Sequence, residues 1–212
     1  MDKDSQYKAH KNAYMLAKAI AIAAEAHSQV LDKVGQPYIK HPLRVMLRFD
    51  FANDTHDLSQ DFELQIIAVL HDVLEDCPEW TAERLREEGF SERSVTALEF
   101  LDHSDDRPYK RYILDMVLAG NTDAIQVKMS DLLDNSDTQR LGDKQLQEKD
   151  LNRINKYHWS LNFLKKSLKL INAKEYTKLD ELIIQEFPNE KEKLKSLFDN
   201  SEKKTKTNRL KH

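Results

Sequence analysis

A short segment in the first half of the chain places acidic and histidine side chains directly beside a hydrophobic helix. His71-Asp72 follows the apolar run 66–70, and Glu75-Asp76 comes one helical turn later. Charged side chains beside a core need partners, and a divalent metal would be one such partner. In a continuous helix the two doublets would share a face, because residues four apart are neighbours. The spacing therefore predicts that one doublet binds a metal while the other presents carboxylates to whatever the metal binds.

Two further segments carry residues of the kind that bind metals. His41 lies between a turn containing glycine and proline and the following Pro42, which restricts the backbone around it. We expect Pro42 to start a helix and His41 before it to be extended. Farther along, Asp131 and Asn135 share one face of a predicted helix, and Thr138 joins that face if the helix continues.

Each of these segments by itself also has a purely structural interpretation. A His-Asp pair often occurs by chance, and His41 could simply cap the helix that Pro42 begins. Asp131 could be a solvated surface acid, which is common for aspartate. The Glu75-Asp76 pair could merely precede the turn at Pro78. Spacing alone does not show that three segments far apart in the chain converge.

The composition favours a helical protein with one core. Of 212 residues only 4 are glycine and 5 are proline, which indicates long helices with few tight turns. Hydrophobic residues make up 40% and charged residues 33%, which fits one domain with a sizeable core and a charged surface. The net charge of -4 gives no general attraction to nucleic acid or to an anionic membrane.

The cysteine content and the lengths of the apolar runs indicate in which cellular compartment the protein is expected. The single cysteine, Cys77, excludes an internal disulfide framework and fits a reducing environment. The first residues are polar, and no apolar stretch approaches the roughly 18 residues of a membrane span. We therefore expect a cytoplasmic protein with no nucleic-acid partner and no membrane partner. Whether it forms a homo-oligomer stays open.

Apolar residues recur at helical spacing along most of the chain. This pattern predicts an all-α fold, a helical bundle followed by a C-terminal helical extension. We expect the main domain at residues 6–172, the extension at 173–200 and a polar, disordered tail at 201–212. The predicted helices are a helix that begins at Pro42 and those at 13–26, 62–74, 81–88, 91–101, 108–118, 123–135, 144–171, 179–187 and 193–198.

The three candidate segments occur in the same order in a known family. They read Pro37-Tyr38-Ile39 before His41-Pro42, His71-Asp72 before Glu75-Asp76, and Lys128, Asp131 and Asn135 at spacings of three and four. With this combination, from about His27 to Thr138, the chain resembles the hydrolase domains of the Rel/SpoT alarmone enzymes. It also resembles the small alarmone hydrolases, including the metazoan SpoT homologues. The resemblance implies membership of the HD-domain phosphohydrolase superfamily and its helical HD-domain fold.

The resemblance implies a metal centre and a catalytic acidic pair. The positions that match the family's metal ligands are His41, His71, Asp72 and Asp131. The metal of the family is commonly manganese, and two imidazoles with two carboxylates suit Mn²⁺ or another first-row divalent ion. Glu75 and Asp76 match the catalytic pair, and a carboxylate there could accept a proton from water acidified by the metal. Adjacent carboxylates titrate together, so base and acid are not assigned between them.

The substrate positions agree less well with the family. Asn135 and Thr138 match positions that contact the nucleotide. Lys33 belongs to a basic pair that faces the purine base in the family, but Asp32 stands where the family usually has arginine. An acid at this place removes a planar cation that can stack on guanine, and it would repel phosphates. Lys110 is either a cation for a polyphosphate or a solvated residue of a helix face.

Two residues near the motifs are expected to take no part in the chemistry. His27 fits the first segment, but four ligands exist without it, so we interpret it as a structural histidine that packs behind them. Cys77 is interpreted as a buried neutral thiol and not as a nucleophile.

We expect a metal-dependent hydrolase that acts on a phosphate ester or anhydride of a nucleotide. The activity implied by the resemblance is that of a guanosine-3′,5′-bis(diphosphate) 3′-pyrophosphohydrolase, and the implied partner is a small-molecule nucleotide substrate. The alternatives are a phosphatase that acts on another nucleotide such as NADPH, a nucleotide-binding regulator without turnover, and an interaction protein built around the helix at 144–171. The Glu75-Asp76 pair argues against a regulator, because a pure binder has little need for two acids beside a metal.

Overall fold

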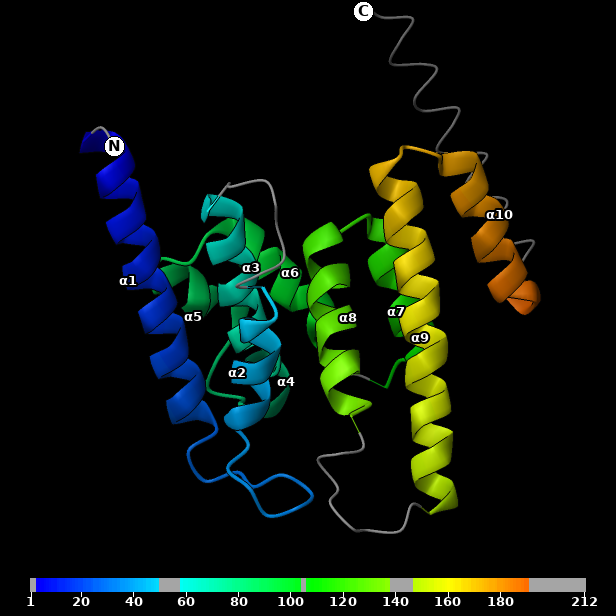
Figure 1. The fold of residues 1–212 in the computed structure, drawn as a ribbon, viewed down its shortest axis with the longest axis horizontal. Helices are drawn as coiled ribbons and strands as arrows, with labels where there is room; N and C mark the ends of the chain where they lie inside the picture. The colour runs from blue at the N-terminus through cyan, green and yellow to red at the C-terminus, as the bar shows by residue number, and fades with distance from the viewer. Residues whose placement is uncertain (1–2, 50–57, 104–105, 138–146, 191–212) are drawn as a thin grey trace, which may run out of the picture. The chain divides into compact units, whose positions relative to one another are not determined.

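The computed structural model describes residues 3–49, 58–103, 106–137 and 147–190, and helices dominate these ranges (Figure 1). The helices are α1 (Lys3–Ala26), α2 (Lys40–Leu47), α3 (Leu58–Leu70), α4 (Val73–Asp76), α5 (Ala82–Glu87), α6 (Glu92–Leu101), α7 (Tyr109–Ala119), α8 (Thr122–Asn135), α9 (Glu148–Asn172) and α10 (Tyr176–Glu186). Within the described ranges, β-type pairing is confined to an isolated bridge between Leu31 and Pro37. The predicted all-α fold is confirmed for this part of the chain, and the predicted helix at 193–198 and tail at 201–212 lie outside it.

The chain divides into two compact units, Met1–Leu164 and Lys165–His212. The division falls within α9, earlier than the predicted boundary between residues 172 and 173, so that domain assignment stays a prediction. The described part of the second unit consists of the end of α9, α10 and the short 3₁₀ helix Pro188–Glu190. All the segments with candidate chemistry belong to the first unit.

Helix α3 forms the centre of the first unit. Its apolar run, Ile66 to Leu70, is buried on every side, as expected for a helix that is hydrophobic all round. Helices α1, α2, α6 and α8 all contact α3, and Figure 1 shows α1 running alongside it. Helices α2 and α8 also contact each other. This packing brings the segment of His41, the end of α3 and the segment of Asp131 to one place.

The corner between α7 and α8 fixes where α8 begins. Gly120 ends α7 with a φ of 64°, a left-handed conformation that favours glycine. Asn121 then caps α8, because its side-chain oxygen accepts a hydrogen bond from the backbone N–H of Ala124 at 2.9 Å. A fixed start determines which residues of α8 face α3, and these include Asp131.

The predicted continuous helix over 62–74 is wrong at His71-Asp72. Helix α3 ends at Leu70 and the short α4 begins at Val73, so the doublet lies in the break between them. The ring of His71 makes a hydrogen bond of 2.8 Å through Nδ1 to the carbonyl oxygen of Ala68. A side chain that bonds this carbonyl competes with the backbone pattern of the helix, which gives a physical reason for the break.

The predicted extended conformation of His41 is also wrong. Helix α2 begins at Lys40 and includes His41, with Pro42 in its first turn. Proline fits there because the first backbone N–H groups of a helix have no partner within it. In the part of the chain that the structure describes, no helix is long and apolar enough to cross a membrane.

Candidate metal centre and adjoining cavity

Four side chains from three segments converge beside the end of α3, and we call them the metal centre: His41, His71, Asp72 and Asp131. One ligand atom from each of His41, His71 and Asp131 lies within 4.8 Å of the other two. The Nε2 atom of His41 lies 3.1 Å from Oδ1 of Asp131 and 3.7 Å from Oδ2 of Asp72. The Nε2 atom of His71 lies 3.7 Å from Oδ1 of Asp131 and 3.1 Å from Oδ2 of Asp72. The structure thus brings together all four predicted ligands.

Both histidine rings are held through Nδ1, so that Nε2 faces the carboxylates. A carbonyl oxygen can only accept, and therefore Nδ1 of His71 carries the hydrogen in the bond to Ala68. In the neutral ring, Nε2 then has a free lone pair. Nε2 of His71 is buried and makes no hydrogen bond within the described residues. A lone pair buried among carboxylate oxygens is an arrangement that a divalent cation would complete, so these residues fit a metal.

Asp134 holds the other histidine, and the sequence motifs did not single it out. Its Oδ2 lies 2.7 Å from Nδ1 of His41, and the residue is 1% exposed. Arg44 donates to both of its oxygens, from Nε at 2.8 Å and from Nη2 at 2.9 Å. A carboxylate behind a ligand histidine fixes the ring orientation and makes the ring a stronger ligand. The available signal was position, because Asp134 follows Asp131 by three residues on α8.

Each ligand carboxylate is oriented by a neighbouring donor. The hydroxyl of Tyr38 donates to Oδ2 of Asp72 at 2.6 Å. Lys128 lies 2.9 Å from Oδ2 of Asp131, and the amide of Asn135 donates to Oδ1 of the same residue. The carboxylates are thereby fixed before any ion binds.

The charges within the metal centre compensate one another. Burial by itself would lower the pKa of His71, but the charges of the neighbouring Asp72 and Asp131 raise it to about 10. Burial would raise the pKa of Asp72, but the charge of His71 holds it well below its usual value. Protons on the histidines therefore balance the acids, and a divalent cation would displace those protons on binding.

The acidic pair at the end of α4 points to two different surroundings. Oε2 of Glu75 accepts a hydrogen bond of 3.3 Å from the backbone N–H of His103. Asp76 lines a cavity, and burial together with the charges of Asp72 and Glu75 raises its pKa to about 6. Asp76 is therefore mostly ionised near neutral pH, yet it takes up a proton more readily than an ordinary carboxylate, as a group that accepts and returns a proton needs to.

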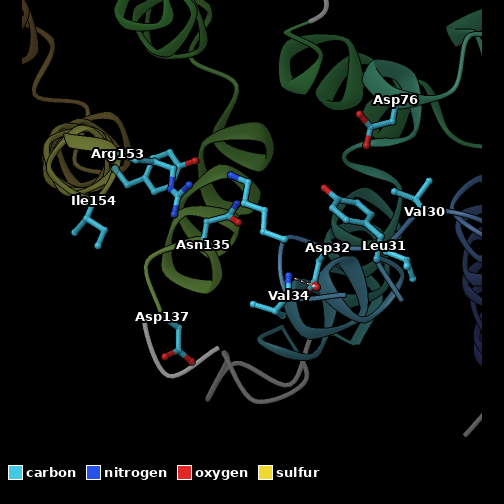
Figure 2. Close-up of a pocket in the computed structure, with 12 residues that line it drawn as sticks. Val30, Leu31, Asp32, Val34, Asp76, Asn135, Asp137, Arg153 and Ile154 are labelled. Atoms are coloured by element: carbon cyan, nitrogen blue, oxygen red, sulfur yellow. Dashed lines mark hydrogen bonds between the residues drawn. The ribbon is translucent and has the colours of Figure 1, made fainter. Parts of the chain in front are cut away.

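The cavity beside the metal centre has a volume of about 430 Å³. Figure 2 shows that its walls come from the loop after α1, from α4 with Asp76, from α8 and from α9. The lining residues are Val30, Leu31, Asp32, Lys33, Val34, Tyr38, Asp76, Asn135, Asp137, Arg153, Ile154 and Tyr157. Tyr38 and Asn135 belong both to this wall and to the set of donors that orient the ligand carboxylates, so the cavity and the metal centre are continuous.

The predicted substrate contacts are only partly brought together. Lys33 and Asn135 line the cavity. Lys110 does not line it, and its Nζ lies 4.5 Å from the ring centre of Trp159, because the aromatic ring attracts the cation. Thr138 lies outside the described residues.

Helix α9 contributes cavity residues that sequence reasoning missed. Arg153 and Tyr157 are half-buried and come from a helix that carries none of the three motifs. Nη2 of Arg153 bonds to Asp150 at 3.0 Å, one turn earlier on the same helix. In the sequence they read as part of an ordinary amphipathic helix, and no local signal distinguished them.

Asp32, which departs from the family pattern, organises its own loop. Its Oδ1 accepts hydrogen bonds from the backbone N–H groups of Val34 at 3.0 Å and of Gln36 at 2.9 Å. Such bonds shape a turn. In this turn Gly35 adopts a φ of 80°. Asp32 also lines the cavity, so the carboxylate shapes the wall where it adds negative charge.

Two buried groups lie close to the metal centre. His27 is 1% exposed, its ring centre lies 5.0 Å from that of Tyr38, and neither ring nitrogen has a hydrogen-bond partner within the described residues. Burial lowers the pKa of His27. Cys77 is buried, and burial also raises the pKa of its thiol, as expected for an unreactive cysteine.

The curated relatives include two proteins named as pyrophosphohydrolases and a probable GTP pyrophosphokinase of Mycobacterium leprae, which is 36% identical over 77 residues, 36% of this chain and 9% of that one. No family model matches the chain. A guanosine-3′,5′-bis(diphosphate) 3′-pyrophosphohydrolase of Aquifex aeolicus is 34% identical over 140 residues, which are 63% of this chain and 19% of that protein. A protein of the same name from Haemophilus influenzae is 42% identical over 67 residues, 32% of this chain and 9% of that one. The chain thus spans a small part of the length of these relatives.

A solved structure shares the fold. It is a metazoan orthologue of SpoT that hydrolyses ppGpp and plays a role in starvation responses. The superposition covers 81% of this chain and 95% of that chain, with a TM-score of 0.56 and 21% sequence identity. The predicted resemblance to the Rel/SpoT hydrolases is confirmed by these comparisons.

Proposed function

We propose that this chain, a Rel/SpoT hydrolase-like protein of the HD phosphohydrolase superfamily, is a metal-dependent enzyme that removes the 3′-pyrophosphate of guanosine tetra- or pentaphosphate. The main support is the convergence of two imidazole Nε2 atoms and two carboxylates beside a cavity with an acidic residue on its wall. The names of the relatives supply the substrate class, and the geometry supplies a place for the reaction.

The metal centre suits a first-row divalent ion, and we propose Mn²⁺. The ion would be held by His41, His71, Asp72 and Asp131. When bound there, it would act as a Lewis acid on the phosphoryl group and lower the pKa of water. Two neutral imidazoles with two carboxylates leave room in the coordination sphere of such an ion for substrate and water.

The chain's own residues supply proton transfer and orientation. Asp76 would accept the proton of the attacking water, because its carboxyl lines the cavity and has a pKa of about 6. Glu75 would orient that water or the substrate, since the backbone N–H of His103 holds its carboxylate. Asn135 connects the two regions, because it donates to Asp131 and also lines the cavity.

The cavity would bind the nucleotide. Lys33 and Arg153 provide positive charge for phosphates, and the ring of Tyr157 offers a flat surface for a base. Asp32 adds a negative charge to the same wall, so the preference for guanosine tetraphosphate over other nucleotides has to be measured. The single cysteine fits a reducing compartment, and we propose that the reaction takes place in the cytoplasm.

The proposed activity is tested by turnover of a nucleotide panel in the presence of Mn²⁺, followed by chromatography. The panel contains guanosine tetraphosphate, guanosine pentaphosphate and NADPH. Asp72→Ala and Glu75→Ala are compared with the parent protein. We expect Asp72→Ala to lose both metal and turnover, and Glu75→Ala to keep metal while turnover falls by at least about a hundredfold. Equal turnover by all three proteins would refute the mechanism.

The product distinguishes the two enzymatic interpretations. Intact pyrophosphate is expected from guanosine tetraphosphate, whereas a phosphatase that acts on NADPH would release single phosphate. Binding of nucleotides without turnover by the Mn²⁺-loaded parent would instead indicate a regulator. A Glu75→Ala protein that purifies without metal would show that Glu75 is a ligand and not a catalytic acid.

A further inference from the structure

The two oxygens of Asp131 have different partners. Oδ1 lies 3.1 Å from Nε2 of His41 and 3.7 Å from Nε2 of His71, so it faces the interior of the metal centre. Oδ2 lies 2.9 Å from the Nζ atom of Lys128, one turn earlier on α8. The carboxylate therefore lies between the place of the metal and a fixed cation of the protein.

The surroundings of Lys128 show that this cation is built into the site. Its side chain is 14% exposed and that of Asp131 is 5% exposed. The Nζ atom lies 5.3 Å from the ring centre of Tyr112, a fully buried residue whose hydroxyl donates to the carbonyl of Leu101 at 2.7 Å. A buried ammonium needs an anion close by, and Asp131 is that anion.

A structural role alone does not explain why Lys128 is buried against Asp131. Helix α8 is already fixed at its start by the cap at Asn121, and Asn135 already orients Asp131 through its amide. An ion pair buried next to a cluster of acids changes the charge of that cluster. Lys128 adds one positive charge to the group formed by Asp72, Asp131 and the two histidines.

We infer that Lys128 is a resident cation of the metal centre, which compensates Asp131 in the metal-free protein and weakens the binding of the divalent ion. The inference depends on the proposed function, since it assigns a role within the same metal site. Two cations that share one carboxylate repel each other, and in a buried site this repulsion is poorly screened. The metal-loaded centre keeps one additional positive charge beside the place of a polyanionic phosphate substrate.

The test compares Lys128→Met, which removes the charge at similar size, with Lys128→Arg, which keeps it. Mn²⁺ is titrated into each metal-free protein by calorimetry, and thermal unfolding is followed with and without saturating Mn²⁺. We expect Lys128→Met to bind Mn²⁺ at least about tenfold more tightly than the parent. The same variant should melt at a lower temperature than the parent without metal and gain more from Mn²⁺. Lys128→Arg should resemble the parent in both measurements.

Weaker or unchanged Mn²⁺ binding by Lys128→Met would overturn the inference, because a residue that only orients Asp131 loses affinity on removal. If Lys128→Met does not fold, Lys128→Gln gives the same comparison with a neutral donor, and the same outcomes apply. A parent protein that binds no Mn²⁺ would overturn the proposed function together with this inference. Tight binding by the parent with weaker binding by the variant overturns this inference alone.

Discussion

The metal centre and the cavity differ in how deeply their side chains are buried. In the metal centre every proposed ligand has a second partner within the protein, such as Asp134 for His41 and Tyr38 for Asp72. On the cavity wall, Leu31 and Lys33 are exposed. A preorganised centre favours a single chemistry, whereas an exposed wall can vary without loss of the fold. The difference suggests that reaction type and substrate preference depend on separate parts of this protein.

The largest expected effect comes from removal of a ligand in the metal centre. His71→Ala leaves two acids and one imidazole, and we expect Mn²⁺ binding to be lost and kcat/KM to fall on the order of a thousandfold. Calorimetry of the metal-free protein and turnover measure the two effects. The exposed His158 of α9 gives the control His158→Ala, which should behave like the parent. Full Mn²⁺ binding by His71→Ala would remove this residue from the centre.

A smaller effect is expected one layer behind the ligands. Asp134→Asn removes the charge that pairs with Arg44 and holds His41, so Mn²⁺ binding should weaken by about 10–100-fold. The matched control is Asp137→Asn, because Asp137 follows Asp134 by three residues but is exposed on the cavity wall. Equal losses of Mn²⁺ affinity in both variants would show that metal binding depends on the cavity wall as much as on the buried centre.

On the cavity wall we expect an effect on substrate binding alone. Arg153→Ala removes a cation that lines the cavity but lies outside the metal centre, so KM should rise about tenfold while kcat stays within about threefold. Steady-state kinetics with the best substrate of the panel measure both constants. Arg153→Lys keeps the charge and should fall between the parent and the alanine variant. A large fall in kcat with unchanged KM would place Arg153 in the chemistry.

The smallest expected effect concerns stability behind the metal centre. Burial lowers the pKa of His27 in the folded protein, so the unfolded state binds the proton more readily. Stability from this residue is therefore present above the unfolded pKa of about 6.5 and is lost as the pH falls below it. Between pH 8 and pH 5.5 the melting temperature of metal-free His27→Phe should fall by roughly 2–4 °C less than that of the parent. An identical fall of the melting temperature in the parent and in His27→Phe would contradict this expectation. A larger fall for His27→Phe than for the exposed control His158→Phe would contradict it too.

Most helices were predictable because their signals are local, but α1 begins at Lys3 and not at the predicted residue 13. The cap at Asn121 and the glycine that follows α7 place the start of α8 within a residue of the prediction. The break at His71-Asp72 was not predictable from periodicity, because a hydrogen bond from the His71 ring to the carbonyl of Ala68 competes with the regular helix pattern. Arg153 was not predictable either, since nothing near it in the chain marks a cavity.

The sequence by itself determined the helical class and the residue types available for chemistry, because helix formation depends on neighbours three and four positions apart. The tertiary structure alone decided that His41 and Asp134, 93 residues apart, meet in one buried hydrogen bond. It also decided that both Nε2 atoms face the carboxylates and that α9 closes the cavity. Contacts across such separations depend on how α2, α3 and α8 pack around a shared core, and that packing results from burial along the whole chain.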